Sequence, residues 1–375
     1  MKIVILGLSI TSSWGNGHAT TYRSLVRELV RLGHKVLFLE RDQPWYAANR
    51  DMPQPPFGRT EIYRSVPELK RRFAEQVDSA DCVIVGSFVP EGKTVGEWVT
   101  RAASGVTAFY DIDTPITLEK IAVDECDYLS ADLIALYDIY LSFTGGPTLE
   151  LLEEEYGSPM ARALYCSVDA TEYFPESRRK KWALGYLGTF GEDRQQKLNS
   201  LLLAPATMWP AGRFVVAGPQ YPKGIRWPAN VERITHLSPV KHRAFYNSQR
   251  FTLNVTRAAM VRAGFSPSVR LFEAAACAAP IISDDWPGLH ALFRSDEEIF
   301  VAKNACEVLE ILQEIPEDAV RDIGSRARER VLREHTSAHR AAELETIIAA
   351  ARGKYAASTT ANVAARELNK QEVVL

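Results

Sequence analysis

A short stretch in the second half of the chain combines residue types that can bind a phosphate ester. Ser266 and Ser268 stand at the start of a predicted helix, and Val269 and Arg270 fall in its first turn. A helix N-terminus presents unpaired N–H groups and the positive end of the helix dipole, so it attracts phosphate. Arg270 adds a cation that can bind a diphosphate through two parallel hydrogen bonds. Glu273, almost one turn further on, can accept hydrogen bonds from ribose hydroxyls.

The loop after the first predicted strand is the second place where chemistry could occur. It contains Gly15, Asn16 and Gly17 and ends at His18. Strand ends in an open parallel sheet face the ligand crevice, and the glycines allow a ligand to approach the backbone closely. The loop lacks the Gly-x-Gly-x-x-Gly fingerprint, so an oxidoreductase that binds NAD is disfavoured.

Three carboxylates follow predicted strands and are further candidates. Asp111 and Asp113 are two residues apart, so they would share a face if the strand continued. At a crevice, a carboxylate can act as a base or bind sugar hydroxyls; the alternative for Asp113 is to cap a turn before Pro115. Glu40 closes another predicted strand. Trp45, a few residues later, could stack on a sugar or fill a hydrophobic gap.

Alternating strands and helices must position these residues. The first half predicts strands over 2–8, 34–40, 82–86, 107–111 and 138–143 and helices over 20–32 and 66–77. The second half predicts strands over 182–187, 213–218, 231–237, 251–255 and 281–283 and helices over 193–203, 239–247, 269–277, 305–314 and 316–335. This order predicts two doubly wound parallel α/β sheets, because parallel strands need helical crossovers.

The second half resembles the sugar-nucleotide site of the GT-B glycosyltransferases. The segments Leu253–Arg257 and Ser268–Cys277 resemble in particular the CgeB-type (spore maturation protein-like, glycosyl transferases group 1-like) branch. The resemblance implies two Rossmann-like domains facing a central cleft. It implies an acceptor-side domain over 1–168, a nucleotide-sugar donor domain over 169–336, and over 337–375 a helix that packs back on the first domain, followed by a polar tail.

The resemblance also implies an activity, which is transfer of a sugar from a nucleoside-diphosphate sugar to a hydroxyl acceptor without a metal. The nucleotide sugar is then a co-substrate, no separate cofactor is expected, and UDP, dTDP and GDP are not distinguished. His18 resembles a histidine that serves as general base in some inverting GT-B enzymes, and Asp113 is the other candidate base; His18 could instead only position the following helix. Arg257 would stabilise the departing diphosphate, or form a structural ion pair with Asp284.

The remaining residues of the expected site follow from the same resemblance. The donor side comprises Gly188, Thr189, Asn254, Arg257, Ser266, Ser268, Val269, Arg270 and Glu273. The acceptor side comprises Gly15, Asn16, Gly17, Glu40 and Asp111. One departure matters: many retaining GT-B enzymes carry an acid eight residues before the position of Glu273, and here that position is Phe265. The missing acid leaves a non-catalytic sugar-nucleotide binder as an alternative. A nucleotide-sugar 2-epimerase, which shares the GT-B fold, is the other alternative.

Composition restricts the partners and the compartment. A chain of 375 residues suggests two domains, and a net charge of −3 does not favour nucleic-acid binding. No apolar run reaches the roughly 18 residues of a transmembrane helix. The five cysteines are scattered without metal-ligand spacing, which predicts reduced thiols, a cytoplasmic protein and no metal site. The acceptor stays open between a glycan, a lipid-linked sugar, a protein and a small metabolite.

Overall fold

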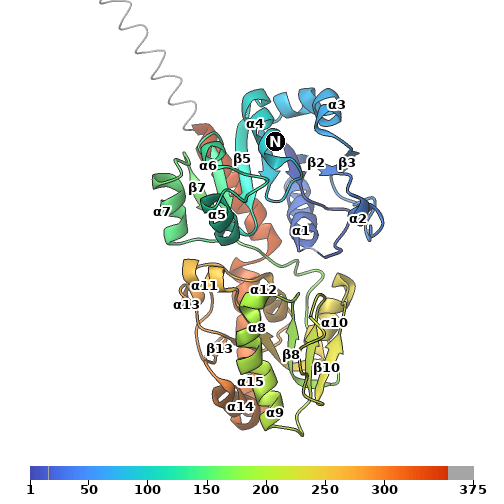
Figure 1. Ribbon diagram of the computed structural model, residues 1–375, viewed down its shortest axis with the longest axis vertical. Helices are drawn as coiled ribbons and strands as arrows, with labels where there is room; N and C mark the ends of the chain where they lie inside the picture. Colours follow the sequence, from blue (N-terminus) through green and yellow to red (C-terminus); the bar gives the residue numbers. More distant parts are fainter. Residues whose placement is uncertain (16, 354–375) are drawn as a thin grey trace, which may run out of the picture.

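Two parallel β-sheets form the framework of the molecule. The computed structural model describes residues 1–15 and 17–353, which form two α/β units stacked one above the other (Figure 1). The first unit is the sheet nearer the N-terminus with its helices, and the second unit is the other sheet with its helices. All strand pairs in both sheets are parallel.

The first sheet has seven strands in the order β3-β2-β1-β4-β5-β6-β7. Its strands are β1 (Lys2–Gly7), β2 (Lys35–Arg41), β3 (Arg59–Tyr63), β4 (Cys82–Gly86), β5 (Val106–Asp111), β6 (Ile139–Ser142) and β7 (Ala161–Ala163). Its helices are α1 (His18–Arg31), α2 (Pro44–Ala47), α3 (Val66–Asp78), α4 (Gly92–Ala102), α5 (Thr114–Ala122), α6 (Ala131–Ile134) and α7 (Pro147–Glu154).

The second sheet has six strands in the order β10-β9-β8-β11-β12-β13. Its strands are β8 (Trp182–Leu187), β9 (Phe214–Ala217), β10 (Val231–Ile234), β11 (Gln249–Asn254), β12 (Ile281–Ser283) and β13 (Phe300–Val301). Its helices are α8 (Glu192–Leu198), α9 (Ala204–Met208), α10 (His242–Asn247), α11 (Ala258–Ala263), α12 (Val269–Ala276), α13 (Leu289–Leu292), α14 (Ala305–Glu314) and α15 (Glu317–Glu334), with a π-helical turn (Asn199–Leu203) and a 3₁₀ turn (Pro239–Lys241).

Both faces of each sheet are buried, as the near-continuous apolar strands predict. In β1, Ile3 and Ile5 belong to the core on the α1 side, whereas Val4 and Leu6 belong to the core that contains α3 and α4. The alternation follows from the two-residue period of a strand. In each sheet, successive strands are added on one side of the strand that comes first in the sequence (β1 or β8) and then on its other side. Such a switch point leaves a crevice at the carboxyl ends of the central strands of each unit.

The last described helix, residues 337–353, returns to the first unit. Figure 1 shows it in dark red beside the first sheet. Its Arg340 donates to the carbonyl of Tyr165 (3.1 Å), and its Arg352 pairs with Asp81 (3.0 Å). The polar tail predicted over 354–375 lies outside the described residues. Within the described residues, none of the helices is both long enough and apolar enough to span a bilayer.

Candidate functional site

A cleft of about 640 Å³ lies where the two crevices face each other. Its first-unit wall comes from the segments after β1, β2, β4, β5 and β6, and its second-unit wall comes from the loops after β8, β9, β10 and β11. The N-terminal end of α12 completes the second wall. A concave site of this size, at the switch points of two α/β sheets, suits a small-molecule ligand.

Arg270 is held at the N-terminus of α12 with part of its guanidinium unused. Ser268 caps the helix by accepting from the Arg270 backbone N–H, and Val269 lines the cleft beside it. The Arg270 Nε donates to the carbonyl of Leu187 (2.5 Å), and Nη1 donates to Asn254 Oδ1 (2.9 Å). Nη2 has no hydrogen bond to any described residue, although the side chain lies in the cleft wall and is only 6% exposed. The guanidinium is therefore fixed in place with one amino group left for a ligand.

Two more arginines face the same space. Arg194, at the start of α8, donates to the carbonyl of Thr189 (2.7 Å), and its buried Nε has no partner among the described residues. Arg257 lies 3.4 Å from a carboxylate oxygen of Asp193. The structural pair between Arg257 and Asp284, the alternative considered above, is not formed. Asp284 instead accepts from Thr256 N and Oγ1, at 3.1 and 3.0 Å.

Glu273 lies one turn along α12, in the same wall as Arg270. Its carboxylate accepts a hydrogen bond from the Tyr246 hydroxyl (2.9 Å) and lies 3.8 Å from His242 Nδ1. His242 also approaches the carbonyl of Leu237 through Nε2 (3.2 Å). Both α10 residues line the cleft, and sequence reasoning did not identify either. They fix the carboxylate where it can accept from a bound hydroxyl.

His18 and Asp113 both line the first-unit wall. His18 is 7% exposed and meets the Phe88 ring edge-on, with 5.4 Å between ring centroids. Burial lowers the pKa of His18 to about 4, so the imidazole is neutral at pH 7. Its Nδ1 has no hydrogen-bond partner within residues 1–15 and 17–353.

Asp113 stands at the start of α5 without capping it, because its carboxylate makes no capping hydrogen bond. The alternative role as a turn cap is therefore not the one observed. Burial raises the pKa of Asp113, and the nearby cations Arg257, Arg194 and Lys120 act against that rise. Across the cleft, the carboxylate thus faces the same arginines that line the second wall.

Glu40 and Asp111, predicted to contact the acceptor, lie behind the cleft and do not line it. Glu40 is fully buried and accepts from Ile10 N (2.7 Å) and from both Thr11 N (2.9 Å) and Thr11 Oγ1 (2.6 Å). The loop after β1 thus satisfies the carboxylate, and Glu40 supports that loop from behind the cleft. Gly15 and Gly17 do line the cleft, and Asn16 lies outside the described residues.

Asp111 has the same supporting role. It accepts hydrogen bonds from the hydroxyls of Tyr140 (2.5 Å) and Thr117 (2.9 Å) and from the backbone N–H of Asp113 (3.1 Å). Burial is the larger influence and raises its pKa to about 6, although these hydrogen bonds act in the opposite direction. The carboxylate therefore holds the start of α5, which carries Asp113, and is not itself accessible to a ligand.

Two predicted donor-side residues also support the site from behind. Asn254 is fully buried and orients Arg270, as described above. Ser266 is buried, and its hydroxyl is 2.8 Å from that of Thr144 in the first unit. Gly188 and Thr189 line the cleft. An added Cβ at Gly188 would come within 2.9 Å of Arg270 Nη2, so the small residue leaves room for the guanidinium.

Known proteins share this architecture. A family model described as "Glycosyl transferase-like" matches residues 194–346. A solved structure of sucrose-phosphate synthase from Thermosynechococcus elongatus is similar over 95% of this chain and 100% of its own, with a TM-score of 0.68 and 14% identity. No curated protein matches the sequence.

Two other similar solved structures are complexes with a uridine nucleotide. Anabaena Alr3699/HepE in complex with UDP-glucose covers 93% of this chain and 100% of its own, with a TM-score of 0.67 and 12% identity. An alpha-glucosyltransferase in complex with UDP covers 93% and 100%, with a TM-score of 0.70 and 13% identity. The fold is GT-B. The predicted architecture of two Rossmann-like domains facing a cleft is thereby confirmed.

In this GT-B molecule, an aromatic ring occupies the position at which many retaining members carry an acid. Phe265 adopts a left-handed backbone (φ 46°), and its carbonyl accepts from Gly145 N in the first unit (2.9 Å). A Cβ added to Gly146 would come within 2.4 Å of the Phe265 ring, so the two units pack tightly there. Phe265 does not line the cleft, and the position has become part of the contact between units.

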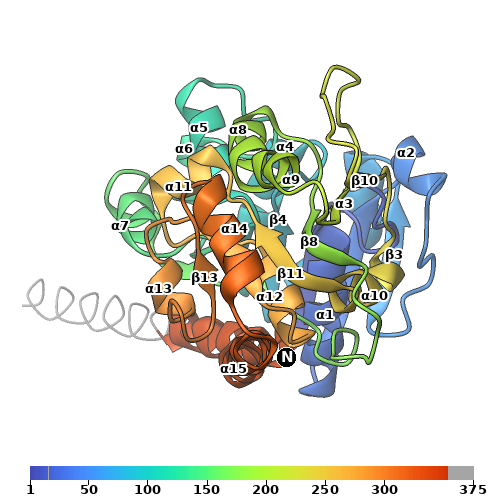
Figure 2. The ribbon, with the colours of Figure 1, turned by 90° about the horizontal axis from the view of Figure 1, so that it is seen from below.

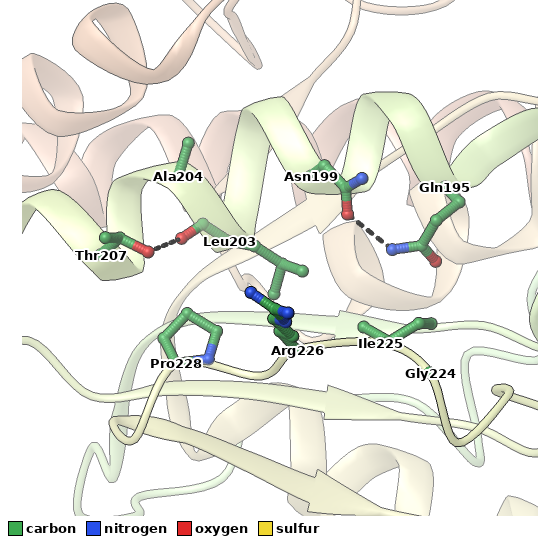
Figure 3. Close-up of a pocket in the computed structure, with 9 residues that line it drawn as sticks. All are labelled: Gln195, Asn199, Leu203, Ala204, Thr207, Gly224, Ile225, Arg226 and Pro228. Carbon is green, nitrogen blue, oxygen red and sulfur yellow. Dashed lines mark hydrogen bonds between the residues drawn. The ribbon is translucent and has the colours of Figure 1, made fainter.

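A second cavity, of about 420 Å³, lies on the second unit away from these residues. It opens between the α8–α9 segment and the loop from β9 to β10, which projects from the unit in Figure 2. Figure 3 shows its lining residues, Gln195, Asn199, Leu203, Ala204, Thr207, Gly224, Ile225, Arg226 and Pro228. None of the predicted site residues lines it. Among the described residues, no group of three or more His, Cys, Asp or Glu side chains could hold a metal.

Proposed function

We propose that this protein is a glycosyltransferase that moves a sugar from a nucleoside-diphosphate sugar to a hydroxyl group of an acceptor. The observation that carries the proposal is Arg270, whose unused Nη2 stands at a capped helix N-terminus inside the cleft. The match to a glycosyltransferase-like family model over residues 194–346 supports it. So do the structural neighbours that were solved in complex with UDP or UDP-glucose.

The donor would bind along the second-unit wall. The diphosphate would lie against the N-terminus of α12, between Arg270 and the pair Arg194 and Arg257. The ribose hydroxyls would donate to Glu273, which Tyr246 holds in place. UDP is the first nucleotide to test, because it is the one named for the neighbours. We place the protein in the CgeB-type branch on the two segments that resemble it.

The transfer step would use the first-unit wall. His18 would accept the proton of the acceptor hydroxyl as that oxygen attacks the anomeric carbon, and Asp113 is the second candidate for this task. The bond between the anomeric carbon and the diphosphate breaks, and the arginines stabilise the negative charge that develops on the leaving group. We propose that these cations carry out this task without a metal. Free cysteines, of which four are buried, favour a cytoplasmic location.

The donor site is tested by replacing Arg270. In Arg270→Ala, we expect the Kd for UDP to rise by about 10- to 100-fold, since a charge-assisted hydrogen bond contributes on the order of 1.5–3 kcal/mol. In Arg270→Lys, we expect a Kd for UDP between those of the parent protein and Arg270→Ala, because lysine keeps the positive charge but cannot form two parallel hydrogen bonds. Arg321→Ala is the matched control, since that arginine is exposed on α15 and does not line the cleft.

Isothermal titration calorimetry measures the affinity, and circular dichroism verifies that each variant is folded. Unchanged UDP affinity in folded Arg270→Ala would refute the donor site. Phe265 favours one other candidate function, a binder without turnover, because the acid is absent. Tight UDP binding without any release of UDP from UDP-sugars, with or without acceptors, would select that candidate.

The base is tested by a pair of nearly isosteric variants, His18→Gln and Asp113→Asn. The variant that removes the true base should lose about 100-fold or more of turnover, the usual contribution of general base catalysis. The other variant should retain most of it. Turnover is followed as UDP released from the donor. UDP affinity should stay unchanged in His18→Gln and should not fall in Asp113→Asn, which removes a negative charge that faces Arg194 and Arg257. Full turnover in both variants would contradict the proposed mechanism.

A further inference from the structure

Two tryptophans stand exposed on the loops that form the first-unit wall of the cleft. Trp14 is 49% exposed and Trp45 is 51% exposed. Ser13 and Gly15, on either side of Trp14, line the cleft, and so does Tyr46, next to Trp45. They are the only aromatic residues among the exposed large hydrophobic side chains of the described chain, which are Trp14, Leu32, Trp45, Val123, Leu136, Met208 and Val240.

A hydrogen-bond network holds the Trp14 loop from behind. The Asp51 carboxylate accepts from Ser13 N (2.9 Å) and Ser13 Oγ (2.8 Å), and it pairs with Arg23 through both Nη atoms (3.0 and 2.8 Å). Although partial burial opposes the effect, the hydrogen bonds from Arg23 and Ser13 lower the pKa of Asp51 to about 2. The network therefore stays charged and intact across the physiological pH range.

The Trp45 loop is fixed to the Trp14 loop. The Asn49 side chain donates to the carbonyl of Trp45 (2.7 Å), and the Ser12 hydroxyl donates to the carbonyl of Asn49 (2.8 Å). The two rings are thus carried by loops that are bonded to each other. Loops that are held in advance lose little backbone entropy when a ligand stacks on the rings that they carry.

The charges beside these loops are balanced. Arg23 pairs with Asp51, Arg50 pairs with Asp42, and Arg41 pairs with Glu91. A polyanion such as a nucleic acid requires cations that are available for its phosphates. This rim instead combines aromatic faces with compensated charge, which suits a neutral ligand that has both C–H faces and hydroxyl groups.

From this we infer that the acceptor is a neutral oligosaccharide, whose sugar rings stack on Trp14 and Trp45 while one hydroxyl enters the cleft. This inference rests on the proposed function and names the acceptor class for it. The C–H face of a sugar packs on an aromatic ring, and its hydroxyls bond to polar groups such as Ser13 and Thr20, which line the cleft.

The test uses the full chain saturated with UDP and measures binding of cellotetraose, maltotetraose and chitotetraose by calorimetry. We expect at least one of them to bind. Trp14→Ala and Trp45→Ala should each weaken that binding by about 10-fold, as loss of one stacked aromatic contact predicts. Trp14→Phe should retain most of the oligosaccharide affinity, because it keeps an aromatic ring at this position. Leu136→Ala removes a similarly exposed apolar side chain of the first unit outside the cleft, and should leave binding unchanged.

The outcomes separate this inference from the proposed function. If UDP binds but none of the oligosaccharides does, or if the tryptophan variants bind them as the parent protein does, the inference is overturned and the donor site stands. If a short DNA duplex binds instead, the acceptor is a nucleic acid. If UDP itself does not bind, the proposed function fails first.

Discussion

Burial decides how the two candidate bases behave at the level of single residues. His18 has lost basicity to its apolar surroundings and is neutral at pH 7, so it can accept a proton without first releasing one. For Asp113, burial raises the pKa while Arg257 and Arg194 act against the rise. A bound diphosphate would neutralise those arginines, so donor binding should raise the proton affinity of Asp113 further. The strength of that base would then depend on the presence of the substrate.

The lowered pKa of His18 also predicts a dependence of stability on pH. The pKa is about 6.5 in the unfolded chain and about 4 in the folded protein, so between these values the unfolded chain binds more protons. Stability is then lost as the pH falls through this window. Protonation of His18 should lower the free energy of unfolding by about 2 kcal/mol at pH 5 relative to pH 8.

Urea unfolding of the parent protein and of His18→Gln at the two pH values measures this cost. Groups such as His335, whose pKa burial also lowers to about 4, contribute equally to both proteins and cancel. The parent should lose about 2 kcal/mol more than the variant between pH 8 and pH 5. Equal losses would show that His18 is not buried as neutral imidazole.

At the scale of elements, apolar patterning predicted the sheets well but missed segments that lack it. The central strands are short buried runs, and their order required two parallel sheets. Edge strand β3 has the mostly polar sequence Arg-Thr-Glu-Ile-Tyr, so no apolar run marks it. Helix α4 contains two glycines and starts after Glu91, which has a positive φ of 56°. Strand β3 and helix α4 form because they pack against neighbouring elements, and this packing cannot be predicted from the local sequence.

The predictability of the site follows the same division. Ser268, Arg270 and Glu273 could be found because a capped helix after a glycine-bearing loop is a local pattern. Tyr246 could not be found, because it meets Glu273 only through the packing of α10 on α12, 27 residues apart in sequence. The orientation of Glu40 could not be predicted, because a carboxylate at a strand end can face either the cleft or the loop behind it.

One close approach between loops requires a glycine after β9. Gly218, after β9, has a φ of +142°, and an added Cβ would come within 2.0 Å of the carbonyl oxygen of Gly188. The loops after β8 and β9 therefore touch backbone to backbone in the second-unit wall. Only a residue without a side chain permits this contact.

At the scale of the whole molecule, one short segment links the units beside the proposed donor site. Phe265 accepts from Gly145, Ser266 bonds to Thr144, and the carbonyl of Pro267 accepts from the thiol of Cys166 (3.3 Å). This segment leads directly into α12. Any change in the angle between the units must therefore act on the helix that would hold the phosphates, so opening of the cleft and grip on the donor are mechanically connected.

The path of the chain between the units has a consequence for dissection of the protein. Val168 forms a parallel bridge with Thr336, so the chain leaves the first unit and returns to it at adjacent points. The second unit is thus an insert within the first, and the first is assembled from two separate pieces of sequence. The returning piece supplies the buried side chains Ala341, Leu344, Ile348 and Ala351.

A fragment of residues 169–336 should therefore fold alone and bind UDP, because every proposed donor contact lies within it. A chain that stops at 336 should instead aggregate or unfold in its first unit, since it lacks one covering helix. Calorimetric titration of the fragment and limited proteolysis of the shortened chain distinguish these results from a protein with two consecutive domains. The second unit could therefore be exchanged between related proteins by joining the chain at two neighbouring positions, Val168 and Thr336.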